Sequence, residues 1–405
     1  MASFPTPSPL IDTVAQINKN PPNSKRILFR KDWDNVLTFL KQYDGNEQTF
    51  NAYRRELERL LQWSWLIAKK SILTFGREDI ENYLKFCLKP PKSWIGTKNV
   101  YRFIEKEGKR IPNPVWRPFV ASVTKAEHKE GSSPDKADYH LSPKAIREIF
   151  TVLNSFYNTL LIDEKIVRNP ITLVKQKSRY IQTQQTEKQI LRLTDEQWKF
   201  CVEAITEMAN KNTYYERVLF IMSAMYLMYL RISEFVASER WTPAMNHFYQ
   251  DSEKQWWFKT IGKGNKLRTI AVSRDMLAAL KKYRVSLGLP TLPSPSDNSP
   301  LIPKIKGHGP IEDTRHLRKL IQECFDVAAE NLRKKGNIDE ANSLSTATVH
   351  WLRHTGISDD INKRGRPLAH VRDDAGHTSV STTDRYNDVE VKKRHASAIR
   401  KKIIE

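Results

Sequence analysis

The sequence is poor in cysteine, with three in 405 residues, at Cys87, Cys201 and Cys324. They lie far apart, cannot form an even disulfide framework, and include no pair with metal-ligand spacing. We therefore interpret them as isolated buried thiols of a cytoplasmic protein, which excludes the disulfide-rich secreted class. We expect neither a metal nor another cofactor.

Long apolar runs are also lacking. The longest covers residues 218–230, has 13 residues and is closed by Arg217 and Arg231. A helix that spans a bilayer needs about 20 apolar residues, so this run predicts a buried helix. The N-terminus has no cationic region followed by an apolar stretch, so no signal peptide is evident. We expect no membrane partner.

Acidic residues are fewer than basic ones, with 46 Asp and Glu against 67 Lys and Arg and a formal net charge of +21. This excess fits a polyanionic partner, most simply nucleic acid, although an otherwise basic soluble protein stays open. A helical pattern that begins near Phe50 carries its basic residues on the polar face: Arg54, Arg55, Arg59, Lys69 and Lys70. This face is explained equally well as solvated or as laid along DNA phosphates.

Composition divides the chain into two domains with distinct ends. The expected segments are a flexible arm (1–25), a helical domain (26–175) with a Pro-rich insertion (89–141), a polar linker (176–190), a second domain (191–390) and a C-terminal helix or tail (391–405). Because helical periodicity dominates and only one stretch has strand character, the expected fold class is mainly α with a small β-sheet (α+β).

Local signals place the elements of this fold. Ser142 followed by Pro143 predicts the start of a helix over 142–161. Thr194 to Gln197 forms a capping-box pattern that opens the second domain. A buried helix is predicted over 212–238, and two strands joined by a tight glycine turn over 256–272.

Two basic residues of the second domain have surroundings typical of anion binding. Arg231 follows the long apolar run, where a cation is costly unless an anion or the nearby Glu234 neutralises it. Lys263 lies between two glycines, which let a backbone approach a ligand closely. Taken singly, a helix-end cation and an exposed hairpin tip explain them as well.

Two histidine patterns follow toward the C-terminus. His350 and Arg353 are three residues apart and share a helix face. His354 has zinc-helix spacing to His350, but the glutamate of such a site is missing, so metal binding is disfavoured. Tyr386 comes nine residues after His377, in a polar segment. A lone tyrosine is usually a packing or hydrogen-bonding residue.

Together and in this order, the patterns resemble the tyrosine recombinase (phage integrase) family, over roughly residues 27–400. The family's Arg-x-Ser-Glu motif, β-turn lysine, His-x-x-Arg box, Gly-His box and tyrosine match this chain at Arg231, Lys263, His350, Arg353, His377 and Tyr386. Tyr229 and Ala375 depart from the small or aliphatic residues that are more usual beside the first arginine and the Gly-His box.

The resemblance implies a C-shaped clamp on DNA and cleavage through a 3′-phosphotyrosine, without metal or ATP. Tyr386 is the implied nucleophile, His350 the candidate base and Lys263 the proton donor to the departing 5′ hydroxyl. Arg231, Arg353 and His377 are expected to stabilise the charged phosphorane, with Glu234 in support. Lys266 and Arg268 are further DNA-binding candidates.

The implied partner is a double-stranded recombination site, bound by a dimer and paired in a tetramer, with an accessory DNA-bending protein or partner recombinase as an option. The tail 391–405 would dock on a neighbouring protomer. The implied location is the bacterial nucleoid. A type IB topoisomerase-like enzyme and a non-catalytic DNA-binding regulator are the alternatives. Whether the task is integration, excision, resolution or transposition stays open.

Overall fold

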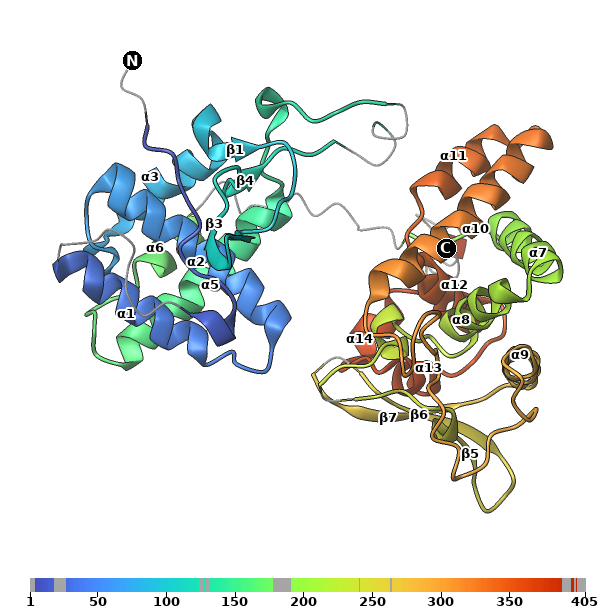
Figure 1. The fold of residues 1–405 in the computed structure, drawn as a ribbon. Coiled ribbons are helices and arrows are strands. Elements are labelled where there is room, and N and C mark those ends of the chain that lie inside the picture. Colours follow the sequence, from blue (N-terminus) through green and yellow to red (C-terminus); the bar gives the residue numbers. More distant parts are fainter. Residues whose placement is uncertain are drawn as a thin grey trace, which may run out of the picture. The chain divides into compact units, whose positions relative to one another are not determined.

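The computed structural model describes residues 4–17, 27–123, 127, 131–177, 191–239, 241–262, 264–387, 395, 396 and 398. The chain divides into two compact units, unit 1 (Met1–Glu187) and unit 2 (Lys188–Glu405), blue to green and green to red in Figure 1. Both are mainly helical with small sheets, which confirms the expected α+β class. Among the described residues, no helix is long and apolar enough to cross a membrane.

The helices of unit 1 pack around a single core. Their bounds are Ile27–Lys41 (α1), Glu47–Trp63 (α2), Arg77–Leu88 (α3), Pro143–Ile162 (α5) and Pro170–Lys177 (α6). The core between them is aromatic as well as aliphatic, and Trp33, Leu57, Tyr83 and Phe156 are each fully buried. Burial of large side chains from four helices therefore holds this unit together.

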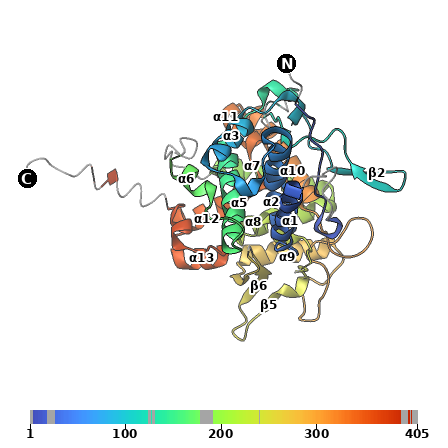
Figure 2. The ribbon, with the colours of Figure 1, turned by 90° about the vertical axis from the view of Figure 1, so that its left-hand side faces the viewer.

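The Pro-rich segment forms short strands. Ile95–Gly96 (β1) pairs in parallel with Phe119–Val120 (β4), and Phe103–Lys106 (β2) pairs with Lys109–Pro112 (β3) in an antiparallel hairpin. Figure 2 shows this hairpin extending away from the helices of unit 1. The prolines exclude a long helix here, as expected from their missing N–H groups.

The N-terminal segment differs from the flexible arm that its composition predicts. Within residues 4–17, the side chain of Ile11 is fully buried. The backbone N–H of Leu10 donates to Glu58 over 2.7 Å, and Arg110 Nη2 donates to the Asp12 carboxylate over 3.0 Å. This part of the chain is tied to the unit 1 core by contacts 48 and 98 residues away in sequence, which local composition does not reveal.

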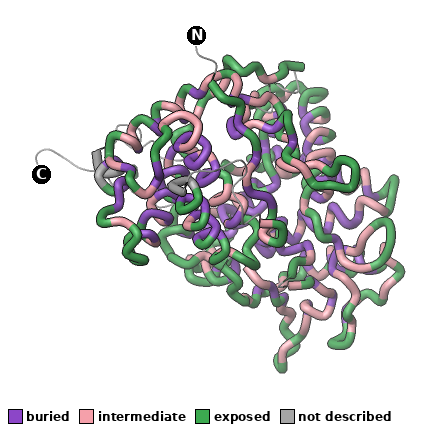
Figure 3. The backbone as a smooth tube through the Cα atoms, turned by 60° about the vertical axis from the view of Figure 1, so that its left-hand side comes forward, coloured by how far each residue is buried: buried purple, intermediate pink, exposed green. Residues whose placement is uncertain are grey.

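The helices of unit 2 pack around a second core, flanked by a three-stranded sheet. The helices are Asp195–Lys211 (α7), Glu216–Leu227 (α8), Arg274–Ser286 (α9), Thr314–Lys334 (α10), Ile338–Thr346 (α11), Val349–Asn362 (α12), Leu368–Ala375 (α13) and Val380–Asp384 (α14). The strands Phe248–Gln250 (β5), Trp256–Ile261 (β6) and Leu267–Ala271 (β7) form an antiparallel sheet in that order. Figure 3 colours each residue by its burial and shows buried and exposed residues following one another along the chain.

Both predicted helix starts are confirmed. The Ser142 side chain accepts the N–H of Ala145, and α5 begins at the next residue. The Thr194 side chain accepts the N–H of Gln197, whose own side chain accepts the N–H of Thr194. These reciprocal bonds satisfy N–H groups that a helix start leaves unpaired. The predicted β-ribbon over 256–272 is confirmed as β6 and β7.

The buried helix predicted over 212–238 is shorter than expected. α8 ends at Leu227, and a 3-10 turn follows only at Ile232–Phe235. Between them Tyr229 has φ of +54°, so the chain leaves the helical path before Arg231. An apolar run indicates that a segment is buried, but it does not indicate whether the backbone stays helical. The end of the helix is therefore predicted too late in the sequence.

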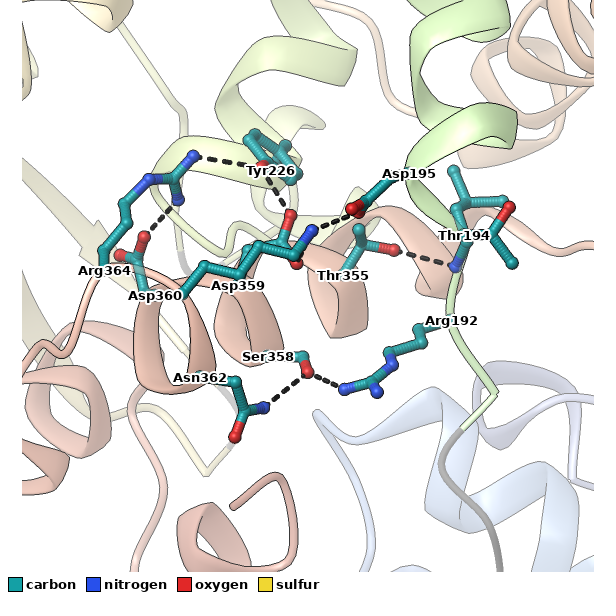
Figure 4. Close-up of polar contacts among 12 residues, drawn as sticks. Arg192, Thr194, Asp195, Tyr226, Thr355, Ser358, Asp359, Asp360, Asn362 and Arg364 are labelled. Carbon is teal, nitrogen blue, oxygen red and sulfur yellow. Dashed lines mark hydrogen bonds and ion pairs between the residues drawn. The ribbon is translucent and has the colours of Figure 1, made fainter. Parts of the chain in front are cut away.

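α12 is the central helix behind the site described below. It approaches α8 very closely at Gly356, where a Cβ would lie 1.9 Å from the carbonyl oxygen of Tyr226. Its C-terminal half is also held by polar contacts, since the Tyr226 hydroxyl donates to Asp359 over 2.7 Å and Arg364 donates to that hydroxyl over 3.0 Å (Figure 4). Close packing and hydrogen bonds thus fix α12 on α8.

Candidate active site

Arg353 is the most deeply buried cation of the predicted site. It lies on α12, is 4% exposed, and donates from Nη1 to the Tyr229 carbonyl and from Nη2 to the Ala375 carbonyl over 2.6 Å. Burial, then the nearby charges of Arg231 and Arg268, lower the pKa of Arg353 to about 9. The carbonyl dipoles orient the guanidinium but do not neutralise it, so the site favours an anion.

Tyr229 presents its carbonyl to Arg353 through an unusual backbone conformation. A left-handed φ in a residue other than glycine costs roughly 1–2 kcal/mol, and Tyr229, at φ of +54°, is fully buried. Its hydroxyl donates to Asp360 on α12, which anchors the ring. The surrounding contacts therefore hold Tyr229 in a strained backbone conformation, and in this conformation its carbonyl accepts a hydrogen bond from Arg353.

Glu234 connects two further arginines. Its Oε1 lies 3.1 Å from Arg231 Nη1, and its Oε2 lies 2.5 Å from Arg268 Nη2. Arg268 also donates to the Asp374 carbonyl over 2.6 Å and has only 8% of its side chain exposed. One buried carboxylate thus serves two guanidiniums, which leaves net positive charge beside Arg353.

The β6–β7 loop lies against this cluster. A Cβ on Gly262 would lie 3.5 Å from Arg231 Nη1, so the loop backbone contacts the arginine. Lys263, the next residue, lies outside the described residues. Lys266 is exposed in the same loop, and its carbonyl accepts the N–H of Gly262 over 2.9 Å.

Tyr386 follows α14, with its ring 6% exposed and in a small apolar cluster with Tyr229 and Ile357. Its hydroxyl lies 2.5 Å from Nδ1 of His354, and its carbonyl accepts from Asn362 Nδ2 over 2.7 Å. Burial raises the pKa of the hydroxyl, while the positive charge of Arg353 opposes the rise. The phenol is therefore protonated at neutral pH, and a histidine nitrogen lies within hydrogen-bonding distance of it.

His377 lies between the buried arginine and the tyrosine. Its Nε2 is 3.2 Å from Arg353 Nη2, its Nδ1 is 2.9 Å from Thr383 Oγ1, and its ring stacks on Tyr386 at 6.2 Å. Because Arg353 only donates, Nε2 is the acceptor and Nδ1 carries the proton. Burial and the charge of Arg353 lower the pKa of His377 to about 4, which agrees with a neutral ring.

His354, which the sequence suggested only as a disfavoured metal ligand, contacts Tyr386, whereas His350 does not. Burial, then Arg353 and His350, lower the pKa of His354 to about 4, so the ring is neutral at pH 7. His350 is exposed, and its ring centroid is 6.4 Å from that of His354. In the described part of the chain, no group of three or more His, Cys, Asp or Glu residues could hold a metal ion. In the sequence, only the position of His354 directly after Arg353 could have indicated that His354 belongs to the site.

The DNA-binding candidates of unit 1 differ in their surroundings. Arg55, Lys69 and Lys70 are exposed. Arg59 fits neither interpretation of this face, solvated or laid along phosphates, because it has 14% of its side chain exposed and pairs with buried Glu56 at 3.0 Å. Arg54 is also engaged, since it donates over 2.5 Å to the backbone carbonyl of Asp12. Residues 4–17 contact Arg54, and residues 118–119 contact Arg59, so both segments cover part of the basic face of α2. Helical periodicity within α2 does not reveal these distant segments.

The described residues of the site combine a protonated phenol with a neutral base and a cluster of guanidiniums. The phenol can attack an electrophile if His354 takes its proton. The cluster can stabilise developing negative charge, because Arg231 and Arg353 lie in a partly water-excluded site. A substrate with negative charge at its reacting centre, such as a phosphodiester, fits this arrangement.

Comparisons with known proteins agree with this chemistry. Residues 192–393 match the phage integrase family model. Tyrosine recombinase XerC of Chlorobaculum parvum is 22% identical over 265 residues, which is 62% of this chain and 71% of that protein. Tyrosine recombinase XerD of Listeria monocytogenes is 24% identical over 279 residues, which is 69% of this chain and 80% of that protein.

Two solved structures share the fold. XerH site-specific recombinase bound to palindromic difH substrate, in a post-cleavage complex, has a TM-score of 0.53 at 14% identity, with 95% of this chain and 91% of that chain covered. A lambda integrase dimer bound to a COC′ core site has a TM-score of 0.50 at 11% identity, with 88% and 94% covered. At these identities the likeness concerns the fold alone.

Proposed function

The chain belongs to the phage integrase family of tyrosine recombinases and is a site-specific DNA recombinase, and we propose that Tyr386 forms its covalent link to a DNA 3′ phosphate. The observation that carries this assignment is the position of the Tyr386 hydroxyl, 2.5 Å from a neutral histidine nitrogen and in the same site as buried Arg353. A phenol needs both a proton acceptor and nearby positive charge to attack a phosphodiester at neutral pH.

The cleavage step assigns one task to each group. His354 Nδ1 takes the phenolic proton, the phenolate oxygen bonds to phosphorus, and the bond between phosphorus and the 5′ oxygen breaks. Lys263 protonates the departing 5′ oxygen. Religation runs the same steps in reverse with a 5′ hydroxyl of another strand, so the energy of the broken bond is retained and ATP is not needed.

The transition state carries extra negative charge, and we assign its stabilisation to Arg231 and Arg353, while His377 holds the Arg353 guanidinium in place through Nε2. Arg353 uses three of its contacts on Tyr229, Ala375 and His377, which leaves guanidinium N–H groups free for phosphate oxygens. His350, which the sequence suggested as the base, is assigned to the phosphate instead. Part of its surface is open to solvent and can meet a substrate. Partial burial, followed by the nearby charges of Arg318, Arg353 and Arg231, lowers its pKa.

DNA binding beyond the cleaved phosphate is assigned to the exposed basic residues Arg55, Lys69, Lys70 and Lys266. Arg55 and Lys70 also pair with carboxylates, but their side chains stay more than 40% exposed. Arg54, Arg59 and Arg268 are less exposed, and their internal partners indicate that they support the protein instead. The substrate is a double-stranded recombination site, with 26–175 as the DNA-binding domain, 176–190 as the linker and 191–390 as the catalytic domain. A dimer on one site and a tetramer on two paired sites, with residues 391–405 docked between protomers, complete the proposal.

A covalent-adduct assay tests the assignment of Tyr386. Duplexes bound by the full-length protein are selected from a random pool, nicked at successive positions, labelled at one end and incubated with protein and EDTA. We expect a protein–DNA adduct on a 3′ phosphate, visible in a denaturing gel. Tyr386→Phe should bind the duplex and form no adduct, while the control Tyr249→Phe on β5 should form it.

Three results contradict the proposal. The adduct persists in Tyr386→Phe, the linkage is to a 5′ phosphate, or cleavage strictly requires a divalent cation. Relaxation of supercoiled DNA without any exchange between two sites would instead support the topoisomerase alternative, in which the same residues act on one duplex.

A further inference from the structure

Arg366, in the segment between α12 and α13, joins three groups that come from different elements. Its Nη1 donates to the Tyr229 hydroxyl and to Asp360 Oδ2, both over 3.0 Å, and its Nη2 lies 2.7 Å from Asp374 Oδ2. Asp360 belongs to α12 and Asp374 to α13, and both are at most 11% exposed. One guanidinium therefore ties two helices and the strained Tyr229 together.

The two carbonyls that orient Arg353 belong to this bridged structure. One is the carbonyl of Tyr229, whose ring hydroxyl receives Arg366. The other is the carbonyl of Ala375, which directly follows Asp374. A shift of either element would move an acceptor of Arg353, because the backbone of each is continuous with a group that Arg366 holds.

We propose that Arg366 is a positioning residue for the recombination reaction, because its bridge between Asp360 and Asp374 sets the two carbonyls that aim Arg353 at the cleaved phosphate. The inference rests on the proposed function of Arg353. Arg366 itself contacts neither Arg353 nor Tyr386 through any described hydrogen bond, and it acts through Tyr229, Asp360 on α12 and Asp374 on α13.

The neighbouring Arg364 offers a matched control. It binds the same carboxylate, through Asp360 Oδ1, and the Tyr226 hydroxyl (Figure 4). It makes no described contact with Tyr229 or with Asp374. An effect that comes only from the loss of a positive partner of Asp360 would appear in both variants, whereas an effect on the Arg353 acceptors would appear in the Arg366 variant alone.

The experiment compares full-length wild type, Arg366→Met and Arg364→Met on the nicked duplex described above. We expect Arg366→Met to slow adduct formation by roughly ten- to a hundredfold, since small misplacements of a catalytic group have effects of this size. Duplex affinity should change less than threefold. Arg364→Met should keep its rate within about threefold of wild type. If Arg366→Met does not fold, Asp374→Asn breaks the same bridge at constant volume and should give the same loss.

A charge-modified substrate separates positioning from general damage. A methylphosphonate at the cleaved position replaces one nonbridging oxygen by a methyl group, so less negative charge needs stabilisation by Arg353. The defects of Arg366→Met and Arg353→Ala, relative to wild type on the same substrate, should both shrink at least fivefold. Tyr386→Phe should stay inactive on it.

The possible results distinguish a failure of this inference from a failure of the proposed function. If wild type forms no adduct on any nicked duplex, the assignment of Tyr386 fails. If wild type reacts but Arg366→Met is as fast as Arg364→Met, or its defect is unchanged on the methylphosphonate, the positioning role alone is overturned.

Discussion

The hydroxyl of Tyr386 lies 2.5 Å from Nδ1 of His354, a residue 32 positions earlier in the chain. Tyr386 is buried and His354 is partly buried, and His354 follows Arg353 directly on α12. The same helix therefore carries the cation that opposes the raised pKa of the phenol and the imidazole that can accept its proton.

The first prediction concerns the choice of base. His354→Asn should slow adduct formation about a hundredfold at pH 7, since a positioned base contributes roughly 10²–10⁴. Its rate should then rise with pH, because the phenol must lose its proton to solvent and burial raises its pKa. His350→Asn should lose activity without that pH dependence. Equal pH profiles for the two variants would exclude His354 as the base.

The second prediction concerns acid stability. His354 and His377 each have a pKa lowered to about 4 by burial and by Arg353. The unfolded chain binds these protons more readily, so their contribution to stability is complete above about pH 6.5 and is lost as pH falls toward 4. Urea unfolding at several pH values should show this loss. His354→Asn should take up about one proton fewer on unfolding, unlike the control His370→Asn, which changes an exposed residue of α13. If the free energy of unfolding of His354→Asn depended on pH as steeply as that of wild type, the lowered pKa of His354 would be contradicted.

The third prediction concerns Glu234, which serves Arg231 and Arg268. Glu234→Ala removes the carboxylate partner of both and leaves Arg268 largely buried without a carboxylate, which should lower the free energy of unfolding by about 3–5 kcal/mol. Glu253→Ala, on an exposed turn, should change it by less than about 0.5 kcal/mol. Denaturant titration of both proteins gives the comparison. A loss below 1 kcal/mol in Glu234→Ala would mean that the carboxylate is not needed to hold the arginines.

The fourth prediction concerns the contact between α12 and α8. Gly356→Ala would place a methyl group 1.9 Å from the Tyr226 carbonyl oxygen, so the helices must separate. We expect a loss of about 3 kcal/mol or more, with a fall in adduct formation because α12 carries Arg353 and His354. Gly76→Ala, where the nearest atom would be 3.8 Å away, is the control. A wild-type melting temperature for Gly356→Ala would refute this packing.

The fifth prediction separates phosphate contacts from structural arginines. Replacing Lys69 or Lys70 by alanine should leave stability near wild type and lower the slope of log affinity against log salt by about 0.9 per contact. Arg59→Ala should instead destabilise unit 1 by roughly 1.5–3 kcal/mol, because buried Glu56 loses one of its two arginine partners and the Pro118 carbonyl loses its donor. Salt titrations of binding and urea unfolding measure the two effects. If Arg59→Ala kept normal stability but changed the dependence of DNA affinity on salt, Arg59 would be a phosphate contact and not a structural residue.

The sequence by itself determined what depends on neighbours along the chain. Hydrophobic periodicity and the caps at Ser142 and Thr194 predicted where α5 and α7 begin, because capping bonds span three residues. The order and spacing of Arg231, His350, Arg353, His377 and Tyr386 predicted the family. These signals need no knowledge of which helices touch.

Tertiary structure alone decided the geometry of the site. The left-handed turn at Tyr229 ends α8 early and supplies an acceptor to Arg353, 124 residues away. His354 meets Tyr386, and Ile11 enters the core of unit 1, only because distant segments fold against them. The local sequence pattern determines which face of a segment is apolar. The partner of a buried polar group is determined by the packing of distant segments, because a buried donor or charge without a partner is energetically costly.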